Sequence, residues 1–248
     1  MTESIGVSVA DHVATVELKR PPHNFFDEAL LTELADVVTS FDDTADVRSI
    51  VLCSEGRNFC AGADLRGMGP DGIRRVYRQS ARLFSGRKPI VAAVHGRAVG
   101  GGLGLAMAAD FRVVAPDARL TANFAQLGFH QGFALSVTLS AAVGQQHAQD
   151  LLYTGRQVDG AEAVEIGLCD RLADDPRAGA AAYAAEIAAS APLAVPAIRA
   201  TLRRQLVSET VAALDLEASA QASLLDTKDF EEGIAASIGK RPPNFTGA

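Results

Sequence analysis

Two short turns rich in glycine, each directly after an apolar run typical of a buried strand, constrain this chain more than any other feature. The first turn is 59–65 (Phe-Cys-Ala-Gly-Ala-Asp-Leu), which follows the apolar run 49–53. The second is 95–102 (His-Gly-Arg-Ala-Val-Gly-Gly-Gly), which follows the apolar run 90–94. Residues this small allow a ligand to approach the backbone N–H groups closely. We therefore expect the two turns to form one site, in which two free N–H donors bind a single oxyanion.

The spacing of apolar residues predicts an α/β fold. Residues 5–10 and 13–18 alternate between apolar and polar side chains, which predicts a hairpin. Asp27 is placed to cap a helix whose apolar stripe includes Leu30 and Leu34. Strands and helices then alternate through the first half, which is typical of α/β layers. The elements predicted in this stretch are strands over 49–53, 90–94 and 111–115 and helices over 71–85 and 101–109.

The second half has a different character, because helical patterns dominate from residue 135 to residue 238. One further strand is expected over 168–172. The last helices carry apolar stripes but have no sheet of their own to cover, and such helices often pack on another subunit, so we expect an oligomer. These helices are predicted over 195–206, 210–225 and 227–238.

Composition and charge exclude several classes of protein. The chain has 248 residues, of which 48% are hydrophobic, enough for a large domain with a sizeable core. Thirty acidic and 23 basic residues give a formal net charge of -7, which disfavours nucleic-acid binding. No apolar segment reaches the roughly 18 residues that a membrane span needs, and the first residues lack the pattern of a secretory signal. The expected location is the cytoplasm.

Known motifs argue against metal, nucleotide and serine-hydrolase sites. Cys53, Cys60 and Cys169 are scattered without metal-ligand spacing, so no metal site is expected. A dinucleotide-binding G-x-G-x-x-G run beginning at Gly100 would need glycine where Leu105 stands. The chain also lacks a G-x-x-x-x-G-K-[ST] loop and a G-x-S-x-G elbow. The three consecutive glycines at 100–102 then have two interpretations. They form an oxyanion site, or they only permit tight packing of a strand against a helix.

The ordered set of motifs resembles the crotonase (enoyl-CoA hydratase/isomerase) superfamily over essentially the whole chain. The two glycine turns carry the resemblance, together with the run 106–110 that follows them. Further matching runs are 20–24 (Arg-Pro-Pro-His-Asn), 151–155 (Leu-Leu-Tyr-Thr-Gly) and 241–245 (Arg-Pro-Pro-Asn-Phe).

The resemblance implies a fold and a ligand. The expected fold is a spiral of ββα turns over residues 1–190, with a C-terminal helical region over 191–248 that builds a homotrimer or a hexamer. The expected ligand is an acyl-CoA thioester, so coenzyme A enters as part of the substrate and no prosthetic group is needed. By position, the oxyanion donors would be the backbone N–H groups of Ala63 and Gly101.

The same resemblance implies contacts with the nucleotide part of coenzyme A. Lys240 and Phe245 would reach it from a neighbouring subunit. For Arg66 and Lys240 the alternative is an ordinary solvated cation. The other residues that match the family's binding positions are Asn24, Ala61, Ala63, Leu65 and Arg66.

The chain departs from the family where its hydratases carry two glutamates. Gly104 and Phe124 stand at those two positions. Each positioned acid or base contributes typically ~10²–10⁴-fold to a rate, so hydration by the usual mechanism is not expected. The acyl pocket is expected to be apolar, lined by phenylalanines 25, 26, 124, 129 and 133.

His130 is the candidate replacement acid or base, because imidazole titrates near neutral pH. It lies in the loop 128–132, where the resemblance implies that relatives with altered chemistry carry new acidic groups facing the acyl end. The alternative is that His130 caps the helix expected to begin near Phe133.

Two functions remain open. The first is an acyl-CoA enzyme of the enoyl-CoA hydratase/isomerase type, which stabilises a thioester enolate or oxyanion with two backbone N–H groups and isomerises, hydrolyses or, with His130, hydrates its substrate. The second is a non-catalytic subunit that binds acyl-CoA. Small residues at Ala63 and Gly101 favour the enzyme, whereas the missing glutamates favour the binding subunit.

Overall fold

The computed structural model describes residues 4–64 and 69–248. Within these residues the main sheet has six strands in the order β1-β2-β3-β4-β6-β9. β1 (Ile5–Ala10) and β2 (Val13–Leu18) form the antiparallel hairpin predicted from the sequence, and the later strands run parallel to their neighbours. These later strands are β3 (Ser49–Ser54), β4 (Ile90–Val94), β6 (Phe111–Val114) and β9 (Arg171–Leu172).

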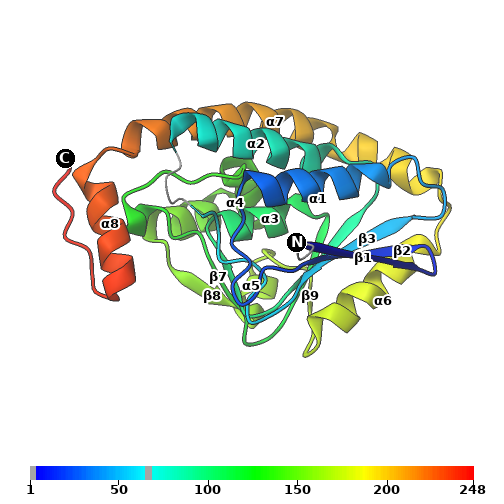
Figure 1. Cartoon of the computed structure of the whole chain (residues 1–248). Coiled ribbons are helices and arrows are strands. Elements are labelled where there is room, and N and C mark those ends of the chain that lie inside the picture. Colours follow the sequence, from blue (N-terminus) through cyan, green and yellow to red (C-terminus); the bar gives the residue numbers. More distant parts are fainter. Residues whose placement is uncertain (1–3, 65–68) are drawn as a thin grey trace.

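Helices cover both faces of this sheet, which explains why its central strands are apolar. Every residue of β3 and β4 is buried, as expected for parallel strands between two helical layers. α1 (Glu28–Ser40) and α2 (Pro70–Ser85) lie over one face, and α6 (Pro176–Ala188) lies over the other (Figure 1). α1 begins where predicted, because the Asp27 carboxylate accepts the N–H of Leu30 at 2.8 Å.

A second, smaller sheet in the described part of the chain was not predicted. Its strands are β5 (Arg97–Val99), β7 (Arg119–Thr121) and β8 (Gln157–Asp159), in that order. Each is too short to show the alternation by which a strand is recognised in a sequence. The small sheet holds the first glycine turn, because Cys60 forms a β-bridge with Ala98 of β5.

The central helix of the core follows the second glycine turn. α3 (Gly101–Ala108) is apolar, and all its residues after Gly101 are buried. The chain then continues through the 3₁₀ turn η1 (Ala125–Leu127), α4 (Leu135–Thr154) and α5 (Gly160–Glu165).

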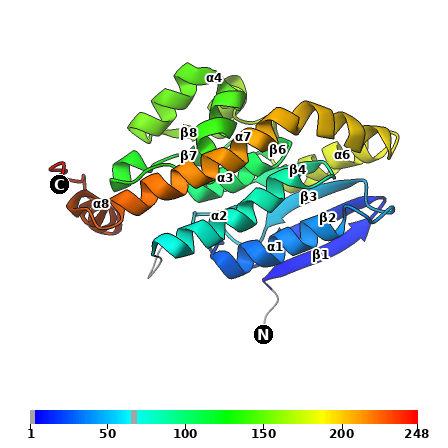
Figure 2. The same ribbon diagram turned by 90° about the horizontal axis from the view of Figure 1, so that it is seen from above.

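The C-terminal region differs from the prediction in one respect. α7 (Ala194–Leu224) is one continuous helix, where two helices over 195–206 and 210–225 were predicted. The residues between those two ranges include neither glycine nor proline, so nothing in them ends the helix. α7 lies beside α2, which in turn lies beside α1 (Figure 2).

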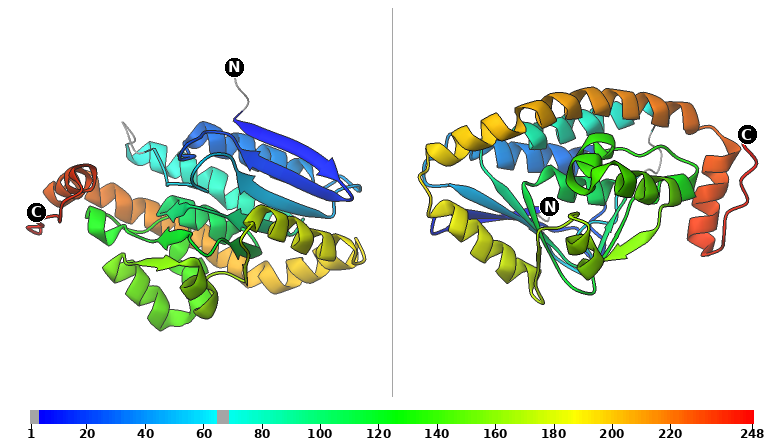
Figure 3. Two further views of the ribbon diagram at one scale, coloured as in Figure 1. Left: turned by 90° about the horizontal axis from the view of Figure 1, so that it is seen from below. Right: turned by 180° about the vertical axis from the view of Figure 1, so that it is seen from behind.

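α8 (Lys228–Gly239) turns away from α7 and lies against η1 (Figure 3). Two glycines allow this close approach. A Cβ placed on Gly128 would lie 2.6 Å from the main chain of Asp229, and one on Gly233 would lie 2.4 Å from that of Leu127. α8 therefore packs on its own chain, backbone against backbone.

Among the described residues, no helix is long and apolar enough to cross a membrane. The same residues include no group of three or more histidine, cysteine, aspartate or glutamate side chains placed to hold a metal ion.

Candidate active site

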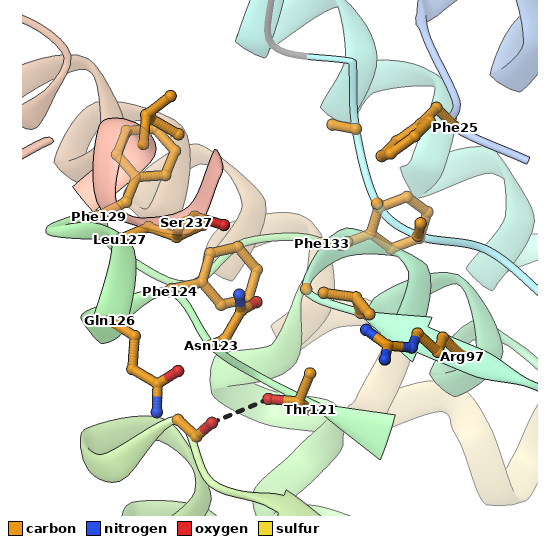
Figure 4. Close-up of a pocket in the computed structure, with 18 of the residues that line it drawn as sticks. Phe25, Arg97, Thr121, Asn123, Phe124, Gln126, Leu127, Phe129, Phe133 and Ser237 are labelled. Atoms are coloured by element: carbon orange, nitrogen blue, oxygen red, sulfur yellow. Dashed lines mark hydrogen bonds between the residues drawn. The ribbon is translucent and has the colours of Figure 1, made fainter. Parts of the chain in front are cut away.

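A cavity of about 1160 Å³ lies between the two glycine turns and residues of α2, α7 and α8. All five phenylalanines predicted for an acyl pocket line it. In Figure 4, Phe25 and Phe133 lie on one side of the cavity, and Phe124 and Phe129 lie on the other. The backbone of both glycine turns forms a further part of the wall, through Ala61, Gly62, Ala63, Gly100 and Gly101.

The two turns come together at this wall. A Cβ placed on Gly101 would lie 3.8 Å from the backbone nitrogen of Ala63, and one on Gly62 would lie 4.0 Å from that of Gly101. Ala63 is held in place by a β-bridge with Phe26, whose carbonyl accepts the N–H of Asp64 at 2.8 Å. The two residues proposed as donors are therefore neighbours in space.

The N–H groups of Ala63 and Gly101 have no hydrogen-bond acceptor in the part of the chain that the structure describes. Gly101 is the first residue of α3, where the N–H has no partner within the helix and the helix dipole adds partial positive charge. Gly62 and Gly100 have φ of 110° and 53°, which glycine adopts much more readily than other residues. The arrangement can stabilise an oxyanion.

Two of the residues predicted to bind coenzyme A line this cavity in addition to Ala63, namely Ala61 and Lys240. Lys240 was expected to act from a neighbouring subunit, but it lines the cavity of its own chain, immediately after α8. Phe245 is 40% exposed and is not among the lining residues. Leu65 and Arg66 lie outside the described residues.

Asn24 supports the first glycine turn rather than lining the cavity. Its side chain is fully buried, and its amide donates to the carbonyl oxygens of Glu55 at 2.7 Å and Asn58 at 2.8 Å. Its side-chain oxygen accepts the N–H of Arg20 at 2.9 Å. A side chain bonded in this way has both of its N–H donors occupied within the protein.

His130 is not among the residues that line the cavity. Its Nδ1 lies 2.7 Å from the carbonyl oxygen of the neighbouring Gln131. It does not cap α4 either, because the N–H groups of Ala134 and Ser136 donate to the carboxylate of Glu217. The geometry therefore gives no support to a catalytic His130, and the cap comes from a residue far along the chain.

The two positions expected to carry glutamates have different surroundings. Phe124 lines the cavity, whereas Gly104 does not. A Cβ placed on Gly104 would lie 2.4 Å from Cβ of Phe133 and 2.9 Å from its Cγ. Phe133 is fully buried, so its side chain fills the space into which a side chain at position 104 would project.

Replacing Gly104 with glutamate is therefore expected to destabilise the protein rather than to supply a catalytic acid. Overpacking of this kind typically costs about 1–3 kcal/mol in the free energy of unfolding, and denaturant titration measures it. The matched variant carries Phe133→Gly as well, which removes the clashing atoms. If Gly104→Glu is as stable as wild type, the packing described above is incorrect.

Sequence reasoning did not identify Arg57 and Arg97, which are among the cationic residues of the cavity. Neither has an ion-pair or hydrogen-bond partner for its side chain among the described residues. Both follow the carboxyl ends of neighbouring parallel strands, β3 and β4, where ligands of α/β sheets commonly bind. None of the described residues that line the cavity is aspartate or glutamate, so its charged side chains are cationic, and they lie among apolar and neutral polar residues.

Comparison with known proteins agrees with this geometry. Residues 8–248 match the family model described as enoyl-CoA hydratase/isomerase. The chain belongs to the enoyl-CoA hydratase/isomerase family. A probable enoyl-CoA hydratase of Bacillus subtilis (strain 168) is 35% identical over 98% of this chain and 99% of its own length. A putative enoyl-CoA hydratase of Thermus thermophilus is 37% identical over 94% of this chain and 97% of its own.

The fold of this family member is the crotonase fold. The solved structure of an enoyl-CoA hydratase/isomerase from Pseudoalteromonas atlantica T6c covers 98% of this chain and all of its own, with a TM-score of 0.88 and 31% identity. The α/β core and the C-terminal helical region are thus those expected from the sequence. The family to which the chain belongs is one of enzymes of the enoyl-CoA hydratase/isomerase type.

Proposed function

We propose that this enzyme binds an acyl-CoA thioester with the carbonyl oxygen between the N–H groups of Ala63 and Gly101. There it stabilises the enolate or tetrahedral oxyanion that forms during the reaction. The observation that carries the proposal is the pair of neighbouring N–H groups, without acceptors in the described chain, at the wall of the cavity. One such donor is worth ~10²–10³-fold in rate when charge develops on the oxygen.

The chemistry proposed does not use a pair of carboxylates. Because the described lining residues include no aspartate or glutamate, protons come from the substrate, from water or from a lining group of another kind. Double-bond isomerisation, thioester hydrolysis and hydrolysis of a C–C bond all pass through an enolate or a tetrahedral oxyanion. The two N–H donors would lower the activation barrier of each of these reactions, because they stabilise the negative charge that forms on the oxygen.

The coenzyme A end of the substrate is assigned to the cationic part of the cavity. Arg57, Arg97 and Lys240 line it and would attract the phosphate groups. The aromatic residues then receive the acyl group. No step of the chemistry needs a metal ion or a prosthetic group, since coenzyme A is carried by the substrate.

Incubation with enoyl-, 3-oxo- and cyclic acyl-CoA thioesters, read by mass spectrometry, tests the reaction class. A gain of water with the thioester intact indicates hydration or ring opening, free coenzyme A indicates thioester hydrolysis, and an unchanged mass with altered absorbance indicates isomerisation. Binding without turnover of any thioester would contradict the catalytic proposal. It would instead favour the second candidate, a non-catalytic subunit that binds acyl-CoA, which the lack of acidic groups among the described lining residues also supports.

We also propose that residues 191–248 build a homotrimer or a hexamer. Large apolar side chains of this region are exposed in the single chain, with Leu202 77%, Leu216 72% and Ile238 79% exposed. Apolar surface on one helix is commonly covered by a second subunit. Light scattering on the purified protein should give three or six times the mass of one chain, and a monomer at micromolar concentration would refute this proposal.

A further inference from the structure

The loop that precedes α4 is held in place by side chains from two other helices. Glu217 of α7 accepts the N–H of Ala134 at 2.7 Å and that of Ser136 at 3.0 Å. Gln221, four residues later on α7, donates to the carbonyl oxygen of His130 at 2.9 Å. Tyr77 of α2 in turn donates its hydroxyl hydrogen to Gln221 at 2.7 Å. The main chain of this loop is therefore anchored by side chains about 80–90 residues away.

The anchored loop has an unfavourable backbone conformation. Phe133 and Ala134 both have φ of 60°, in the left-handed region that residues other than glycine seldom adopt. Each such residue costs of order 1–3 kcal/mol and persists only where the surroundings hold it. Ala134 is also the N-cap of α4 and has no side chain that could satisfy the helix N–H groups. The Glu217 carboxylate satisfies two of these groups and holds the loop in this conformation.

The loop places Phe133 in the wall of the cavity. Its ring packs edge-on against Phe26, with ring centroids 5.4 Å apart, and it covers Gly104. Figure 4 shows Phe133 on the side of the cavity opposite Phe124. We call Glu217, Gln221 and Tyr77 the anchor of this loop. Gln221 and Tyr77 also line the cavity, so part of the anchor belongs to the cavity wall.

Glu217 is a buried carboxylate whose burial is compensated by hydrogen bonds from the loop. Its side chain is almost completely buried, with 1% exposed, and burial raises the pKa of its carboxyl group while the N–H bonds from Ser136 and Ala134 lower it. Burying a carboxylate costs free energy unless hydrogen bonds compensate it. The hydrogen bonds that compensate the buried carboxylate come from the loop that carries Phe133. The carboxylate therefore stabilises the conformation of this loop.

We infer that Glu217, assisted by Gln221, is a positioning residue that acts through Phe133 and sets the size of the acyl group that the cavity accepts. The inference rests on the proposed function, because it assumes that the aromatic part of the cavity receives the acyl chain. With the anchor in place, Phe133 closes the wall over Gly104. When the anchor is weakened, Phe133 moves and the cavity accepts larger acyl groups.

The test compares Glu217→Gln with Glu209→Gln, a matched change at an exposed glutamate of the same helix. Affinities are measured by calorimetry for coenzyme A and for a short and a long 2-oxoalkyl thioether of coenzyme A. These ligands keep the carbonyl oxygen and cannot be hydrolysed. In Glu217→Gln the ratio of long-chain to short-chain affinity is expected to rise roughly tenfold, with the affinity for coenzyme A unchanged. Glu209→Gln should leave all three affinities as they are.

A double-mutant cycle with Phe133→Ala shows whether Glu217 acts through Phe133. Phe133→Ala alone should raise the same ratio, and Glu217→Gln should add nothing in that background. An unchanged ratio in folded Glu217→Gln, or independent effects of the two changes, overturns the inference. If Glu217→Gln does not fold, Glu217→Asp, which keeps the charge but draws the carboxylate back from the two N–H groups, takes its place with the same criteria. If wild type binds none of the three ligands, the proposed function fails, and the inference fails with it.

Discussion

Replacing Gly102 with alanine is expected to lower the free energy of unfolding by about 3 kcal/mol and to abolish turnover. The added Cβ would lie 2.1 Å from the carbonyl oxygen of Cys60 and 2.7 Å from its carbonyl carbon. Both are backbone atoms, so no side-chain rotation can relieve the contact. Overpacking a buried site typically costs about 1–3 kcal/mol, and a clash with backbone lies at the upper end of this range.

The same change is expected to separate the two turns that carry the proposed oxyanion donors. The carbonyl oxygen of Cys60 accepts the N–H of Val99 at 3.0 Å, and this bond ties the first turn to the second. Pushing Cys60 away moves Ala63 relative to Gly101. Denaturant unfolding and turnover are the measurements, and Gly86→Ala is the control, because its Cβ would meet only ordinary contacts, the nearest at 3.6 Å. A Gly102→Ala protein with wild-type stability and activity would contradict this packing.

The second large effect is expected at Asp110, whose carboxylate accepts hydrogen bonds from two arginines, Arg199, which is buried, and Arg203, which is largely buried. The carboxylate accepts hydrogen bonds from Arg199 and Arg203 of α7, both at 2.9 Å, and the N–H of Ile90 at 2.8 Å. The exposed fractions are 10% for the Asp110 side chain, 8% for Arg199 and 12% for Arg203. Asp110→Ala leaves both guanidinium groups buried without a carboxylate, so the free energy of unfolding should fall by about 3–5 kcal/mol.

The control for Asp110 is the exposed pair Arg171–Glu186, whose side chains are 43% and 59% exposed. Because solvent screens such a pair, Glu186→Gln should change the free energy of unfolding by less than about 1 kcal/mol. Denaturant titration of both variants measures the contrast. If both substitutions lower the free energy of unfolding equally, the ion pairs of Asp110 do not stabilise the packing of α7 on the core.

Local patterns in the sequence predicted most of the main sheet and its helices. The hairpin at 5–18 and the helix capped by Asp27 follow from side-chain spacing and a cap residue, which act over a few residues. The small sheet was missed because its strands have three residues each. The break expected inside α7 was wrong, since a weak apolar stripe was taken as two segments when no helix breaker was present.

The proximity of the two glycine turns could be predicted from the sequence, whereas contacts between side chains far apart in the chain could not. Glycine at position 101 and small residues around Ala63 are visible in the sequence, and the structure places them side by side. The contact of Phe133 with Gly104 and the anchor at Glu217 join segments far apart in the chain, and no local pattern reports such contacts. For the same reason His130 could be identified as a titratable residue near the loop but not placed relative to the cavity.

A crystal structure of the enzyme with a bound 2-oxoalkyl thioether of coenzyme A tests the central claim most directly. The claim predicts that the ligand's carbonyl oxygen lies within about 2.7–3.1 Å of both the Ala63 and the Gly101 nitrogen. A ligand bound in the cavity with its carbonyl oxygen away from these two nitrogens, or bound elsewhere on the protein, would contradict it.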